Sequence, residues 1–81
     1  MKVLQTTNLE YENIRYSFDL LMNGEVIYTC YDGGDIQTGF TNWQFVADTF
    51  KMASELVGYK NMKASIVIEG VEYQMKLPKD N

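Results

Sequence analysis

The chain has 81 residues, with seven basic and eleven acidic side chains, a net charge of −4 and no histidine. A chain of this length supports one small hydrophobic core, so we expect a single domain over residues 1–81. The missing histidine removes the commonest general base and metal ligand, and no nucleophile, ligand cluster or cofactor loop replaces it. The composition therefore predicts a protein that is not an enzyme and holds no metal and no cofactor.

Composition also bounds the compartment and the partner. No apolar run approaches the roughly 20 residues of a membrane span, and the N-terminal segment lacks the order of a signal peptide. The single cysteine, Cys30, has no internal disulfide partner, which favours a cytoplasmic protein. All of the net negative charge lies in residues 1–40, so the expected protein partner is basic, and direct nucleic-acid binding is disfavoured.

Strands are expected first. A short strand over 2–7 precedes the clearest pattern in the chain, 14–22, where apolar and polar residues alternate as in a half-buried strand. Asn23-Gly24 follows directly and predicts a two-residue type I′ turn into a second strand over 25–31. The next residues, 32–35, read as a mobile acidic loop that lacks the ligand spacing of a calcium site.

A two-residue turn fixes which side chains face each other in this first hairpin. Phe18 would lie opposite Thr29 on the core face, and Asp19 opposite Tyr28 on the outer face. The outer face is then either covered by the first ten residues or free to bind a partner. For the second case the predicted partner-binding residues are Asp19, Tyr28, Tyr31, Asp32 and Asp35.

A helix is expected after the loop. Thr41 and Gln44 match a capping box, and Gly58 predicts that the helix ends near Val57. The apolar arc of this helix is wider than one sheet face covers, so either the sheet curls around the helix or part of the arc meets another chain. For the second case the predicted oligomer interface is formed by Phe45, Met52 and Leu56.

A second hairpin, 62–68 with 71–77 around Glu69-Gly70, completes the pattern. The elements predict an α+β fold: two antiparallel β-hairpins separated by one amphipathic helix, packed on one face of a four- or five-stranded antiparallel sheet.

The function that fits this outline best is protein binding. Aromatic residues make up 14% of the chain, more than a small core encloses, and they are favoured at interfaces. Size and acidity suggest, by analogy, an inhibitor or adaptor from a phage or mobile element that acts on a basic nucleic-acid-binding surface. Two alternatives stay open: a structural homo-oligomer, and a single-stranded nucleic-acid-binding sheet that stacks bases on Tyr11, Tyr28, Tyr31, Tyr59 and Tyr73.

Overall fold

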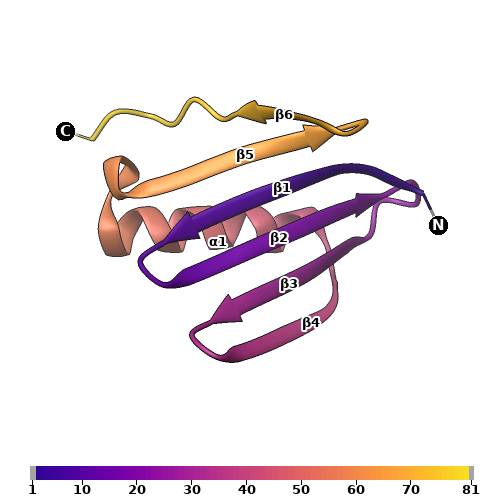
Figure 1. The fold of residues 1–81 in the computed structure, drawn as a ribbon, viewed down its shortest axis with the longest axis horizontal. Coiled ribbons are helices and arrows are strands. Elements are labelled where there is room, and N and C mark those ends of the chain that lie inside the picture. The colour runs from indigo at the N-terminus through magenta and orange to yellow at the C-terminus, as the bar shows by residue number, and fades with distance from the viewer. Residues whose placement is uncertain (1, 81) are drawn as a thin grey trace.

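A computed structural model describes residues 2–80 and has two layers, one sheet and one helix (Figure 1). The fold is α+β, as predicted, but the antiparallel sheet has six strands in the order β4-β3-β2-β1-β5-β6 rather than four or five. The long helix α1 crosses one face of the sheet, behind β1 and β2 in Figure 1. The elements are β1 Val3–Tyr11, β2 Ile14–Leu21, β3 Val26–Asp32, β4 Asp35–Thr41, α1 Trp43–Val57, the short 3-10 helix η1 Tyr59–Asn61, β5 Met62–Ile68 and β6 Val71–Gln74.

The N-terminal strand lies inside the sheet. β1 is longer than the predicted 2–7 and pairs with β2 on one side and with β5 on the other. It therefore joins the two hairpins into one sheet and does not cover the outer face of the first hairpin. The prediction that the first ten residues cover this face is wrong, because their backbone N–H and C=O groups bond to neighbouring strands within the sheet.

The register of β2 and β3 differs from the prediction by one residue. Leu21 N–H donates to the Glu25 carbonyl at 2.8 Å, and Gly24, with φ of +88°, donates to the Leu21 carbonyl at 3.0 Å. The loop thus holds three residues, Met22 to Gly24, as in a type I turn followed by a left-handed residue. A shift of one residue turns every β3 side chain to the other face. Tyr28 consequently lies opposite Phe18, not opposite Asp19.

The segment predicted as a mobile loop is a tight turn. Asp32 pairs directly with Asp35, and Gly33, with φ of +61°, supplies the left-handed backbone of a two-residue hairpin turn. The turn returns the chain as β4, an edge strand that the sequence reading did not include.

Helix α1 begins one residue later than the capping box indicated. The N-cap is Asn42, whose side-chain Oδ1 accepts from Phe45 N–H at 3.3 Å. The helix ends at Val57, as predicted, where Gly58 adopts φ of +78° and donates to the Ser54 carbonyl at 2.9 Å. No helix among residues 2–80 is long and apolar enough to cross a membrane.

The core lies between α1 and the sheet. The ring of Phe45 packs against Phe18 and Tyr28, with ring centroids 6.1 and 5.2 Å apart. Burial of these rings gives the helix a fixed position on the sheet. The buried apolar residues are Leu9, Tyr11, Phe18, Leu21, Val26, Val46, Ala53, Met62 and Ala64.

The second hairpin has the predicted register, with Ile68 opposite Val71 and Ile66 opposite Tyr73. Strand β6 stops at Gln74 instead of Leu77, although Met75 N–H still donates to the Ala64 carbonyl at 2.9 Å. The following tail returns to η1 through Asp80.

Candidate functional site: the uncovered face of the sheet

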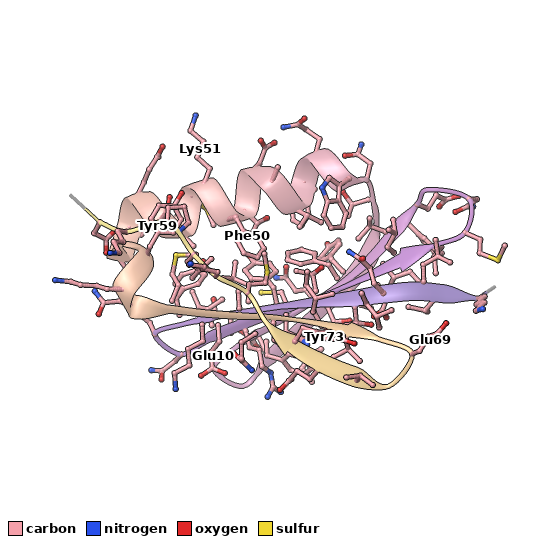
Figure 2. The ribbon with its side chains drawn as sticks, turned by 90° about the horizontal axis from the view of Figure 1, so that it is seen from above. Glu10, Phe50, Lys51, Tyr59, Glu69 and Tyr73 are labelled. Carbon is pink, nitrogen blue, oxygen red and sulfur yellow. The ribbon has the colours of Figure 1, made fainter. Side chains whose placement is uncertain are left out.

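One face of the sheet carries α1, and no other element of residues 2–80 covers the opposite face, which we call the uncovered face. Strand alternation assigns residues to it: the neighbours of buried Leu9, Phe18 and Val26 in each strand point the other way. Figure 2 shows the two sides, with Phe50 pointing from α1 toward the sheet and Glu10 beyond it. The uncovered face is therefore the largest surface that the fold leaves for a partner.

A row of small polar side chains crosses the middle of the uncovered face. Asn8 Nδ2 donates to Ser65 Oγ at 3.4 Å, and Ser65 Oγ donates to Glu72 Oε2 at 3.3 Å. Thr38 Oγ1 donates to the Tyr28 carbonyl at 2.9 Å. Across the six strands the row reads Thr38, Thr29, Ser17, Asn8, Ser65 and Gln74.

Over the edge hairpin, this face carries two apolar cross-strand pairs, one on each side of Thr29 and Thr38. Tyr31 lies opposite Ile36, and Ile27 lies opposite Phe40; we call these four residues the β3–β4 patch. Ile36 and Phe40 remain 66% and 72% exposed, although each is large and apolar. Arg15 lies beside the patch, with its guanidinium 4.6 Å from the centroid of the Tyr31 ring. This cation–π contact holds the Tyr31 ring on the uncovered face.

Carboxylates lie near the β3–β4 patch. Asp32 and Asp35 flank the turn of the hairpin, directly across from each other, and alternation from Tyr31 and Ile36 places both on the helix side of the sheet. Asp19 lies opposite Ile27 on the uncovered face and accepts from Thr6 Oγ1 at 2.7 Å. The patch therefore has one carboxylate on its own face and two more at the turn, and this negative charge favours a basic partner.

The structure divides the predicted partner-binding residues between the two faces of the sheet. Asp19 and Tyr31 share the uncovered face, whereas Asp32 and Asp35 lie at the turn of the β3–β4 hairpin and alternate to the helix side. Tyr28 also leaves the uncovered face. Because the β2–β3 loop is one residue longer than predicted, its ring lies on the helix side against Phe45.

Sequence reading missed Ile36 and Phe40, the two most exposed residues of the patch. A signal for them exists: a two-glycine turn followed by alternating Ile36, Thr38 and Phe40 matches a hairpin with one apolar face. Two aspartates around the glycines favoured a loop instead.

The predicted oligomer-interface residues divide into two groups. Phe45 is half-buried and belongs to the core, so it leaves the apolar arc that we expected to be free. Met52 and Leu56 are 43% and 67% exposed on the flank of α1. The sheet thus covers part of the wide arc, and the flank of Met52 and Leu56 stays open; its role in oligomerisation stays a prediction.

Two tyrosines on the helix side, Tyr11 and Tyr16, are at least partly buried. Tyr16 lies opposite Cys30, and burial together with the hydrogen bond to Cys30 raises the pKa of Tyr16 to about 12. Burial, followed by the nearby Cys30, also raises the pKa of Tyr11. Both phenols therefore keep their protons to a higher pH than an exposed tyrosine does.

The described residues also lack a metal-ligand cluster, and they carry a small cleft beside α1. Residues 2–80 contain no group of three or more carboxylate, cysteine or histidine side chains that could hold a metal ion. A small cleft of about 190 Å³ lies beside α1 and is lined by Trp43, Phe50, Ile66 and Met75, among others. Thr7 also lines it, but its Oγ1 is buried without a hydrogen-bond partner and is out of reach of solvent. The lining of the cleft is therefore mainly apolar.

Comparison with known proteins adds no relative: no family model matches the chain, and no curated protein and no solved structure shows significant similarity to it.

Proposed function

We propose that the protein binds a basic partner protein through the β3–β4 patch and acts as an inhibitor or adaptor. The observation that carries this proposal is the exposure of Ile36 and Phe40, each paired with an apolar residue of β3, on a face that no other element of residues 2–80 covers. Exposed apolar clusters of this kind, bordered by charges, are typical of protein-binding surfaces.

The charge of the partner follows from the carboxylates near the patch. Asp19 shares its face, Asp32 and Asp35 lie at the turn of the hairpin, and residues 1–40 contain only two cations, Lys2 and Arg15. Arg15 is engaged with the Tyr31 ring. A partner that offers lysine or arginine would be attracted before contact and would then bury its apolar groups on the patch. A basic groove that normally binds nucleic acid has this chemistry, and the lone cysteine favours a cytoplasmic setting.

The test starts from a pull-down with the wild-type chain from a native lysate, after which the retained basic protein is purified for binding kinetics. Phe40→Ala should mainly speed dissociation, because it removes buried apolar contact. The double reversal Asp32→Lys with Asp35→Lys should slow association and flatten its salt dependence, because it removes long-range attraction.

The matched control is the double variant Met52→Ala with Leu56→Ala, which removes exposed apolar side chains from the other layer. This control should bind as the wild type does. If the control abolishes binding while the Phe40 and aspartate variants keep wild-type affinity, the proposed surface is wrong.

The nucleic-acid alternative has less support. Of the five tyrosines considered for base stacking, Tyr31 lies on the uncovered face, whereas Tyr11 is buried and Tyr28 packs under Phe45. A stacking platform needs several exposed rings in a basic groove. Titration of the chain with a labelled single-stranded oligonucleotide should therefore give no binding at physiological salt.

A further inference from the structure

Strand β4 leaves backbone groups unpaired along one whole side. The two-residue turn makes Asp32 and Asp35 a pair that exchanges both of its backbone hydrogen bonds. From there the bonding alternates, so the N–H and C=O groups of Gln37 and Gly39 point toward β3. Those of Ile36, Thr38 and Phe40 point outward, at the free lower edge of the sheet in Figure 1.

Strand β4 lacks the features that usually prevent an edge strand from pairing with another strand. It is seven residues long, contains no lysine and no proline, and pairs with β3 without a bulge. Native proteins shorten, charge or bend such edges because unpaired strands recruit other strands. An edge strand of this length that lacks these features is free to pair with another strand.

We propose that this edge pairs, antiparallel, with β4 of a second copy of the chain, in the register that places Thr38 opposite Thr38 of that copy. The outward-facing residues are the ones that must exchange backbone hydrogen bonds, and this register pairs them with one another. It also sets Ile36 opposite Phe40 of the second copy, twice, so that apolar side chains meet apolar side chains. In this register, strand β4 is therefore self-complementary in both its backbone hydrogen bonds and its apolar side chains.

Charge favours the same register. Asp35 is the one charged residue of β4. In the antiparallel pair it lies opposite Thr41 of the second copy, and the two Asp35 side chains are six residues, or roughly 20 Å, apart along the strands. That separation exceeds the screening length of about 8 Å at physiological salt, so their repulsion is weak. A parallel pair would bring them side by side.

The proposed pairing enlarges the surface that we propose for partner binding, but the pairing does not depend on that proposed function. A two-fold axis between antiparallel strands runs perpendicular to the sheet, so both uncovered faces lie on the same side. The two β3–β4 patches then lie next to each other, and each apolar pair of one copy continues into an apolar pair of the other.

Thr38→Pro is the decisive variant, because it removes an outward N–H and leaves the bonds to β3 intact. Light scattering on the full chain should give the mass of two chains for the wild type and of one chain for Thr38→Pro. The control Thr38→Val loses the hydroxyl but keeps the N–H, and it should stay a dimer. Circular dichroism should give the same folded spectrum for all three.

The register has its own test, by disulfide formation in a Cys30→Ser background. Thr38→Cys should crosslink two chains readily, because directly opposite Cα atoms lie about 5.5 Å apart, within disulfide range. Gln37→Cys should not, because its counterpart is displaced by two residues.

A monomeric wild type, or a dimer that survives Thr38→Pro but is lost with Leu56→Asp, would overturn the proposal. Equal crosslinking of the two cysteine variants would overturn the register. If the dimer fails and a basic partner still depends on Phe40, only this inference is wrong. If the dimer holds and no partner depends on Phe40, only the proposed function is wrong.

Discussion

The two hairpins at the edges of the sheet have turns of the same length, but their outer strands differ in length. Each makes a two-residue turn, Gly33-Gly34 between β3 and β4 and Glu69-Gly70 between β5 and β6, with left-handed backbone at Gly33, Glu69 and Gly70. Strand β4 then runs for seven residues, whereas β6 stops after four.

The residues around the two edge strands explain the difference. Beyond β6 the chain carries Lys76, Pro78 and Lys79, which oppose pairing with another strand. Beyond β4 it turns directly into α1 and leaves the outer edge of β4 bare. The comparison teaches that turn chemistry is enough to form a hairpin, while the flanking residues decide whether the outer edge of its second strand is protected or left open.

The largest effect should come from valine substitutions that contrast the two hairpins. Val26 in β3 is fully buried, whereas Val71 in β6 is 52% exposed. Val26→Ala should lower the free energy of unfolding by about 2 to 3 kcal/mol, because it removes buried methyl groups and leaves a cavity. Val71→Ala should cost under about 0.5 kcal/mol. Urea denaturation measures both, and equal losses would show that β6 is packed as tightly as β3.

A smaller effect is expected from glycine substitutions within the β3–β4 hairpin. A Cβ added at Gly39 would lie 2.9 Å from the Tyr28 ring, whereas one at Gly34 would meet nothing within 4 Å. Gly39→Ala should therefore destabilise the protein by about 1 to 2 kcal/mol through overpacking against the ring. Gly34→Ala should leave the thermal midpoint almost unchanged. If both variants melt with the wild type, β4 does not pack closely on Tyr28.

The next effect concerns alkaline pH and the half-buried Tyr16. Its pKa is raised to about 12 in the folded chain, above the ordinary value of 10.0. The native state therefore holds the phenolic proton more tightly than the unfolded state does. The associated stability is present below pH 10 and is lost as pH rises from 10 to 12.

Tyr16→Phe should flatten the fall of the unfolding free energy over this pH window, measured by denaturation at a series of pH values. Tyr73→Phe is the matched control, because Tyr73 is 55% exposed. A wild-type slope in the Tyr16 variant would contradict the assignment.

The smallest effect should arise on the β6 side, at the end of the tail. The Asp80 carboxylate accepts from Lys60 N–H and Tyr59 N–H at 2.8 Å each, and these bonds lower its pKa below the ordinary 3.8. A lowered carboxylate pKa contributes stability above that ordinary value, which is lost as pH falls through the lowered pKa.

Nuclear magnetic resonance measures this contact. The two amide signals should shift as the wild type is acidified, and Asp80→Asn should remove that shift with little change in melting. Glu69→Gln, at the opposite end of the hairpin, is the control. Amide signals that titrate unchanged in the Asp80 variant would show that the tail is not held there.

Several features were readable from the residues alone because their causes are local. Alternation from Ile14 onward gives a strand, Gly58 ends the helix at Val57, and Glu69-Gly70 sets the register of the second hairpin. The α+β class follows from the order of these elements. For the candidate site, Tyr31 and Asp19 were predicted as partner-binding residues and lie on the uncovered face, but the most exposed apolar members of the patch were not predicted.

Tertiary structure decided the features that depend on distant partners or on one backbone angle. Asn23-Gly24 is compatible with a two- or a three-residue loop, and the packing of Tyr28 on Phe45 accompanies the longer one, which moves Tyr28 off the outer face. β1 enters the middle of the sheet because β5, more than 50 residues later, pairs with it. Sequence reports local propensity, whereas the face a strand exposes depends on register and on which element arrives to cover it.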